Sequence, residues 1–131
     1  MVTYIDSRGE LTVIEGHEVP FEIQRVYWIK EVPSGKTRAG HASRLNQEVL
    51  VAIQGSFDVT VDDGYIATTS TMSSDSQPLL IESMRWHTLT NFSPDAIVLV
   101  LASRPYDEAD YIRDYEEFKL RTNISSHDKI S

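Results

Sequence analysis

The segment EVLVAIQGSFDVTVDDGYIATTST, residues 48–71, decides the fold class. It begins with EVLVAI at residues 48–53, which is apolar after Glu48, and continues with residues 57–61, in which apolar and polar side chains alternate. Alternation with a period of two is typical of a strand that has one buried face. The sequence DDG at residues 62–64 indicates a hairpin, because glycine accepts the positive φ that tight turns require. Residues 65–71 are therefore expected to return as the next strand.

Similar short segments occur on both sides of this region. Each is rich in β-branched and aromatic residues and is bounded by turn-forming residues, as strands are. They span residues 11–14, 23–29, 79–81, 87–91 and 96–102. Many short strands without interleaved helices predict an all-β fold, either a sandwich or a barrel.

The C-terminal region has a different period. Between residues 107 and 121, apolar side chains recur at helical spacing, and acidic residues precede them, as they do at helix N-termini. The apolar positions are Tyr111, Ile112, Tyr115 and Phe118. We expect one helix packed on the barrel and a polar C-terminal tail over residues 122–131. No linker or repeat divides the chain, so residues 1–121 are expected to form a single domain.

Length, charge and cysteine content exclude several classes of protein. The chain has 131 residues, which suffice for one domain with one core. A net charge of −8 argues against nucleic-acid binding, which depends on a basic surface. Cysteine is absent, so disulfides are excluded and a reducing cytoplasm is compatible. No apolar run approaches the roughly 20 residues that span a bilayer. We expect a soluble cytoplasmic protein with no membrane partner.

Several residues before and within the predicted strands are candidates for chemistry. His41 is the best candidate for proton transfer, because imidazole titrates near neutral pH, although a surface histidine is the plainer interpretation. Arg38 supplies a fixed positive charge for an oxyanion or a phosphate, unless it is a solvated surface charge. Ser43 faces the same side as His41 if this stretch is extended. Tyr27, two residues after Arg25, either packs in the core or lines a pocket.

The spacing of five residues is similar to the cupin metal motifs, His-x-His-x4-Glu-x6-Gly followed by His-x3-Asn. The five are His41, Glu48, Gly55, His87 and Asn91. Ser43 stands where the second histidine of the motif is expected. Two histidines and one glutamate are a ligand set for a divalent metal with open coordination positions, and the missing ligand weakens that interpretation.

Taken together, the chain resembles the dTDP-4-keto-6-deoxyglucose 3,4-ketoisomerases, the sugar-isomerase branch of the cupins. The resemblance covers nearly the whole chain. It rests on DSRGELTVIE (6–15), PFEIQRVYWI (20–29), RAGHAS (38–43), QEVLVAIQGS (47–56), DDG (62–64), RWHTLTNFS (85–93) and LVLASRPYDEADYIRDYEEF (99–118). The end of the last stretch is the most specific part, because ordinary cupins lack it.

The resemblance implies a fold, an assembly and a reaction. The fold is a cupin jelly-roll barrel over residues 1–121 with a short C-terminal α-helix, in a homodimer whose N-terminal strands exchange. The reaction converts dTDP-4-keto-6-deoxy-D-glucose to the 3-keto isomer by proton transfer through an enediolate, without a metal or other cofactor. Such isomerases supply 3-amino-3,6-dideoxy sugars to surface glycans, such as the O-antigen of lipopolysaccharide, or to antibiotics.

The resemblance also implies residue roles. His41 corresponds to the family's base, while Arg38 and the Tyr27 hydroxyl would stabilise the developing oxyanion. His87, together with Arg8, resembles the galacto-type branch, whose product is dTDP-3-keto-6-deoxy-D-galactose. Substrate contacts are expected from Arg8, Arg25, Ser43, Glu48, Arg85 and Trp86. If Glu48 contacts His41, it is expected to raise the pKa of the imidazole.

Two departures from the family pattern keep other functions open. Ser43 replaces the second histidine, and Glu48 replaces the usual glutamine. One alternative is a metal-dependent cupin enzyme that uses His41, Glu48 and His87. Another is a non-catalytic cupin that binds a nucleotide sugar, which the change at Ser43 favours. Some dTDP-sugar epimerases are also cupins, but they are longer and use a different His-Asp arrangement.

Overall fold

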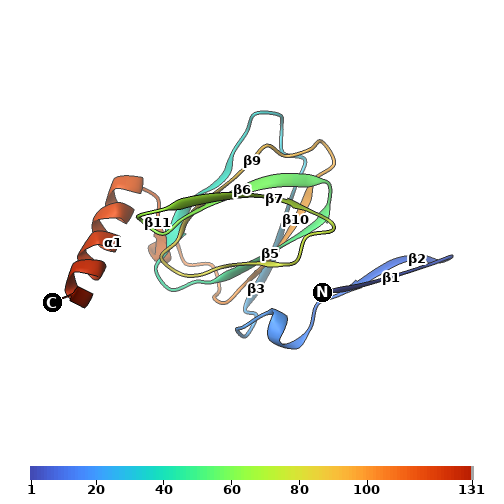
Figure 1. The fold of residues 1–131 in the computed structure, drawn as a ribbon, viewed down its shortest axis with the longest axis horizontal. Coiled ribbons are helices and arrows are strands. Elements are labelled where there is room, and N and C mark those ends of the chain that lie inside the picture. Colours follow the sequence, from blue (N-terminus) through green and yellow to red (C-terminus); the bar gives the residue numbers. More distant parts are fainter. Residues whose placement is uncertain (131) are drawn as a thin grey trace.

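The structure is a computed structural model that describes the fold of residues 1–130 and the side chains of residues 1–123. Two sheets face one another to form a barrel, with a helix at one end and a β-hairpin projecting at the other (Figure 1). The strands are β1 (Val2–Asp6), β2 (Gly9–Val13), β3 (Arg25–Lys30), β4 (Arg38–Ser43), β5 (Glu48–Gln54), β6 (Ser56–Asp62), β7 (Ala67–Ser73), β8 (Leu79–Ile81), β9 (Trp86–Thr90), β10 (Ile97–Ala102) and β11 (Tyr111–Ile112). The helix is α1 (Tyr115–Ile130). The predicted all-β fold with one short C-terminal helix is confirmed.

The barrel consists of a four-stranded and a five-stranded sheet. Their strand orders are β3-β10-β5-β8 and β11-β4-β9-β6-β7. The main core lies between the sheets and is centred on Phe57, Val59, Val98 and Val100, each at most 1% exposed. No helix in the described part of the chain is long and apolar enough to cross a membrane.

The segment that decides the fold behaves as its pattern predicts. β6 alternates, with Phe57 and Val59 buried in the main core, and it pairs with β7 across the turn formed by residues 62–64. β5 is apolar on both faces because both faces are covered. Leu50 points into the barrel, whereas Val49 packs with Leu101 and the segment before β3 in a second cluster. A continuous apolar run is therefore compatible with a strand at this position.

The predicted helix over residues 107–121 is wrong in its first half. Residues Glu108–Asp110 form a 3-10 turn, and β11 follows before α1 begins at Tyr115. β11 pairs with the edge strand β4, and this pairing buries Ile112 completely opposite Ala42. The Asp110 carboxylate accepts hydrogen bonds from two backbone N–H groups in the loop after β4, which fixes the turn. Long-range pairing thus overrides the local helical period.

Helix α1 starts and ends later than its sequence pattern predicts. Asp114 caps it, because its carboxylate accepts from the backbone N–H of Glu116 at 2.9 Å and of Glu117 at 3.1 Å. The helix then continues through the predicted tail as far as Ile130, and Ser131 lies outside the described residues. Phe118, fully buried, anchors the first turns of the helix to the barrel.

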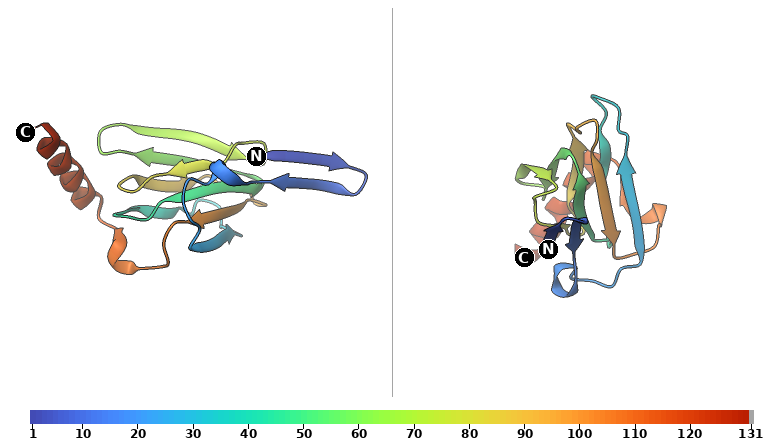
Figure 2. Two further views of the ribbon diagram at one scale, coloured as in Figure 1. Left: turned by 90° about the horizontal axis from the view of Figure 1, so that it is seen from below. Right: turned by 90° about the vertical axis from the view of Figure 1, so that its right-hand side faces the viewer.

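The N-terminal hairpin of β1 and β2 extends away from the barrel (Figure 2). Its two strands pair only with each other among the described strands. The amino group of Met1 contacts the Glu18 carboxylate at the base of the hairpin. Its apolar side chains are exposed, among them Tyr4 at 63% and Ile5 at 72%. These exposures show that the large apolar side chains of the hairpin are left mostly uncovered by the described residues of one copy.

Candidate active site

A cavity of about 530 Å³ opens into the interior of the barrel. Its walls come from both sheets and from the segment that precedes the helix. Among the residues expected from the sequence to form a site, it is lined by Arg25, Tyr27, Arg38, His41, Glu48 and His87. The barrel therefore gathers side chains from β3, β4, β5 and β9 into one site.

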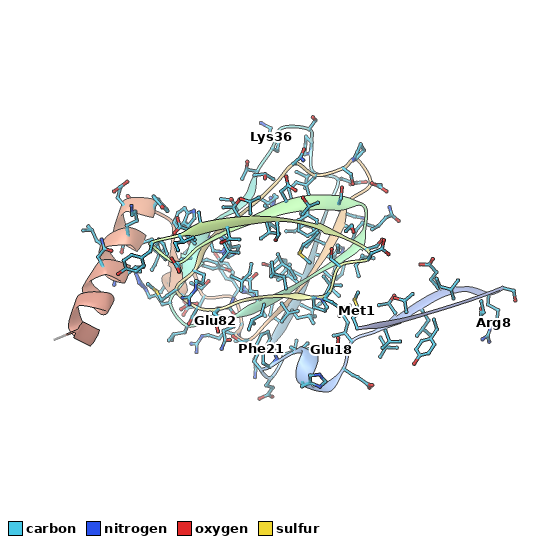
Figure 3. All side chains as sticks on the ribbon, in the orientation of Figure 1. Met1, Arg8, Glu18, Phe21, Lys36 and Glu82 are labelled. Carbon is cyan, nitrogen blue, oxygen red and sulfur yellow. The ribbon has the colours of Figure 1, made fainter. Side chains whose placement is uncertain are left out.

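Two of the arginines expected to bind substrate lie elsewhere in this single copy. Arg8 is at the tip of the projecting hairpin, where Figure 3 shows its side chain far from the barrel. It pairs with Asp6 at 2.8 Å and its side chain is 89% exposed. Arg85 pairs with Glu82 at 3.3 Å on the surface. Neither guanidinium group lines the cavity.

Ser43 and Trp86 also lie outside the cavity lining. Ser43 is the last residue of β4, where it is buried and pairs with Tyr111 of β11. Its backbone carbonyl accepts a hydrogen bond from the Met84 N–H at 2.7 Å. Trp86 packs against Phe118 of α1, with ring centroids 5.9 Å apart. Ser43 is therefore part of the β4–β11 pairing, and Trp86 is part of the contact between the barrel and the helix, so neither lines the cavity.

Among the lining residues that the sequence analysis did not expect, three carry aromatic or charged groups and come from the segment before α1. They are Tyr106, Tyr111 and Arg113. Tyr111 and Arg113 fell within the predicted helix, but this part of the chain folds as a turn and a short strand instead. Arg113 pairs with Glu108 at 2.6 Å, and this pairing lowers the pKa of the Glu108 carboxyl to about 2. The aromatic residues that alternate with an arginine in this segment were the signal in the sequence that could have identified these residues as part of a site.

His41, on β4, lines the cavity. The backbone before it is irregular: Ala39 and Gly40 both have positive φ, and the ladder with β9 shifts register there. This irregularity places His41 beside His87, with ring centroids 4.8 Å apart, and beside Tyr111 at 4.6 Å. The side chain is 9% exposed, and both of its ring nitrogens lack a hydrogen-bond partner within the described residues.

Burial makes His41 a neutral imidazole. Loss of hydration, followed by repulsion from His87, lowers its pKa to about 3. The expectation that Glu48 raises the pKa of His41 is therefore wrong: burial lowers it, and the charge of Glu48 acts instead on the pKa of His87. A neutral imidazole has a free lone pair, which is the form that a general base or a metal ligand requires.

Glu48 is engaged by other neighbours. Its two carboxylate oxygens accept hydrogen bonds from the Tyr27 hydroxyl at 2.8 Å and from the Asn46 side-chain amide at 3.1 Å. Burial and the adjacent carboxylate together raise the pKa of Tyr27 above its ordinary value. Since a phenol carries one proton, Tyr27 directs it at Glu48 and not at the open cavity.

His87 faces His41 across the β4–β9 ladder and is 4% exposed. Its Nδ1 lies 3.4 Å from the backbone carbonyl of Arg85. Desolvation lowers its pKa, so this imidazole is also neutral. One ligand atom from each of His41, Glu48 and His87 lies within 4.8 Å of the others. This donor set fits a divalent transition-metal ion.

Three arginines line the cavity in a chain of net charge −8, and one of them, Arg113, is paired with Glu108. They are Arg25, Arg38 and Arg113. The Arg25 guanidinium lies 5.5 Å from the ring centroid of Tyr27 and 5.8 Å from that of Tyr106. Arginines fixed against aromatic rings bind phosphate groups with two parallel hydrogen bonds. The cavity therefore suits an anionic ligand with a planar ring.

The chain is similar to characterised sugar-nucleotide isomerases along most of its length. A curated TDP-4-oxo-6-deoxy-alpha-D-glucose-3,4-oxoisomerase from Aneurinibacillus thermoaerophilus is 43% identical over 88% of this chain and 84% of its own. The QdtA 3,4-ketoisomerase from Thermoanaerobacterium thermosaccharolyticum, solved as a double mutant in complex with TDP, is 34% identical, with a TM-score of 0.89 over 95% and 91% of the two chains. The WlaRB TDP-quinovose 3,4-ketoisomerase from Campylobacter jejuni is 39% identical, with a TM-score of 0.83 over 90% and 92%.

A family model supports the same relationship. The model described as "FdtA: WxcM-like, C-terminal" matches residues 1–123, which include every residue that lines the cavity. Sequence identity, shared fold and family match agree over nearly the whole chain. The chain belongs to the FdtA family, the WxcM-like C-terminal domains.

Proposed function

We propose that this enzyme converts TDP-4-keto-6-deoxyglucose to its 3-keto isomer by proton transfer. The observation that carries the proposal is His41, a buried neutral imidazole with no hydrogen-bond partner among the described residues, which faces a cavity with three arginines. The relative that is 43% identical is named for this reaction. The arginine wall supplies the positive charge that a nucleoside diphosphate requires.

The reaction moves two protons. The 4-ketone acidifies the proton on carbon 3, and His41 removes it to give an enediolate with its charge on the oxygen of carbon 4. The imidazolium then returns the proton to carbon 4. The hydroxyl on carbon 3 must also lose its proton while the oxygen on carbon 4 gains one. Glu48, which lines the cavity and accepts a hydrogen bond from Tyr27, is suited to accept this second proton and pass it on.

The nucleotide would lie along the arginine wall. A diphosphate carries negative charge on two groups, and the forked guanidinium binds two oxygens at once. Arg25 and Arg113 both contact Tyr111, with Arg25 Nη1 3.4 Å from its hydroxyl and the Arg113 guanidinium 4.7 Å from its ring centroid. Tyr106, 63% exposed at the same wall, offers a face on which a thymine base can stack.

Isomerisation of the substrate in deuterated buffer tests the proposed reaction. We expect the signal of the proton on carbon 3 to disappear from the NMR spectrum while a 3-keto sugar forms in the presence of EDTA. The galacto epimer is expected as the first product, because His87 and Arg8 correspond to that branch of the family. Overall identity does not decide this point, since a relative at 39% is named for TDP-quinovose, a gluco sugar. The gluco epimer as the sole first product would contradict the assignment of product type.

The proposed assembly is a homodimer in which the N-terminal hairpins are exchanged. A two-stranded hairpin is marginally stable alone in water, so β1 and β2 need a further surface. Their exposed apolar side chains, Tyr4, Ile5 and Leu11, provide area for one. In a second copy, the hairpin would carry Arg8 to the partner's barrel, which would explain why Arg8 is far from the cavity of its own chain.

Ile5→Asp is expected to convert the dimer to a monomer, because it places a charge in the proposed interface. Ile66→Asp is the matched control: Ile66 is 69% exposed against 72% for Ile5, but it lies at the turn between β6 and β7. Light scattering coupled to gel filtration measures the mass of each. A wild-type monomer, or an equal effect of both substitutions, would refute the exchanged hairpin.

A further inference from the structure

Three buried side chains with metal-binding atoms converge in the cavity wall. They are His41, Glu48 and His87, which are 9%, 3% and 4% exposed, respectively. They come from three different strands, β4, β5 and β9, so their convergence is a property of the barrel. Ligands of a first-row transition metal lie about 2.0–2.2 Å from the ion. The ligand atoms lie within 4.8 Å of one another, and side-chain rotations toward a common centre would bring them to these distances.

The ring nitrogens of His41 are left unpaired by their neighbours in the described part of the chain. Both ring nitrogens are buried and lack a hydrogen-bond partner within the described residues. Buried polar groups in native proteins are nearly always paired, and an unpaired one costs about 1–3 kcal/mol. An ion bound through one of these nitrogens would satisfy it.

The other two side chains are held as metal ligands usually are. A ligating histidine commonly donates its second ring N–H to a backbone carbonyl, and a ligating carboxylate is itself hydrogen-bonded. His87 Nδ1 lies beside the Arg85 carbonyl at 3.4 Å, an arrangement that leaves the lone pair on Nε2. Glu48 accepts from Tyr27 and Asn46, and these bonds fix the plane of its carboxylate.

We propose that this chain binds one divalent first-row transition-metal ion through His41, Glu48 and His87. Two imidazoles and one carboxylate are ligands for Zn²⁺, Co²⁺, Ni²⁺ or Fe²⁺, whereas Mg²⁺ and Ca²⁺ prefer oxygen alone. Three protein ligands leave open positions that face the cavity. The glutamate, which stands where the family pattern has glutamine, supplies the negative charge that the ion requires.

One consequence rests on the proposed function. An ion bound to His41 occupies the lone pair that would remove the proton from carbon 3. Metal loading is therefore expected to inhibit isomerisation in proportion to occupancy, and EDTA is expected to restore it. The metal-free protein is the active isomerase, and the loaded protein is a different state of the same site.

Titration of the EDTA-treated full-length protein with Co²⁺ tests the site directly. We expect one Co²⁺ per chain, with visible absorption bands typical of nitrogen and oxygen ligands, and displacement by Zn²⁺. Glu48→Gln keeps the size of the side chain and an oxygen that accepts from Tyr27, but it removes the charged ligand. We expect it to weaken binding by more than the roughly 10- to 100-fold that loss of an outer hydrogen bond costs.

Two further variants keep the test decisive. His87→Asn removes a ligand from a different strand and should also abolish the Co²⁺ spectrum. His17→Asn removes an exposed histidine in the turn before β3 and should leave it unchanged. The proposal would be overturned if the wild type gave no Co²⁺ spectrum. It would also be overturned if Glu48→Gln and His87→Asn both gave the same spectrum and affinity as the wild type. Isomerase activity measured in EDTA reports separately on the proposed function.

Discussion

His41→Asn is expected to abolish isomerisation and to leave TDP binding intact. Asparagine has no basic nitrogen, so the proton on carbon 3 has no acceptor at that position. General base catalysis contributes about 10²- to 10⁴-fold, and a loss of that size is expected in kcat. The readouts are deuterium exchange at carbon 3 by NMR and TDP affinity by calorimetry. The arginine wall does not contain His41, which is why the affinity should change little.

His17→Asn is the matched control, because His17 is exposed and lies outside the cavity. It should exchange the carbon-3 proton at the wild-type rate. A wild-type protein that binds TDP and shows no exchange would favour the non-catalytic sugar-nucleotide cupin. Full exchange by His41→Asn would instead show that another group acts as the base.

Gly55→Ala is expected to destabilise the barrel by several kcal/mol. Gly55 joins β5 to β6 with a φ of +70°, a conformation that costs a residue with a Cβ about 1–2 kcal/mol. A Cβ there would also lie 2.3 Å from Ser93 Oγ and 2.7 Å from the Cα of Ala96. Forcing atoms into such a packed position costs about 1–3 kcal/mol more. Urea unfolding measures the free energy of unfolding of each protein.

Gly35→Ala separates the two causes. Gly35 has a φ of +79°, close to that of Gly55, but no atom lies within 4 Å of its added Cβ. It should therefore lose only the conformational part, about 1–2 kcal/mol. Equal losses in the two variants would show that the contact with Ser93 and Ala96 relaxes without cost.

The positions of the strands in this protein could be predicted from the local pattern of apolar and polar residues. Alternation with a period of two located β6, and the run of residues 48–53 located β5, because burial of one face or of both leaves a direct trace in the residue types. The DDG turn was predicted for the same reason: the required φ restricts the residue. The spacing of His41, Glu48 and His87 likewise indicated that they belong to one site.

The state of that site was decided by tertiary structure alone. The pairing of β4 with β9 and β11 buries His41 against His87 and Tyr111, and this burial lowers the pKa that the sequence had led us to expect raised. The same pairing turned a predicted helix into a strand and placed Arg113 in the cavity wall. Residue type and spacing determined which groups are available. Desolvation and long-range pairing, which depend on neighbours distant in the sequence, determined how those groups ionise and where they face.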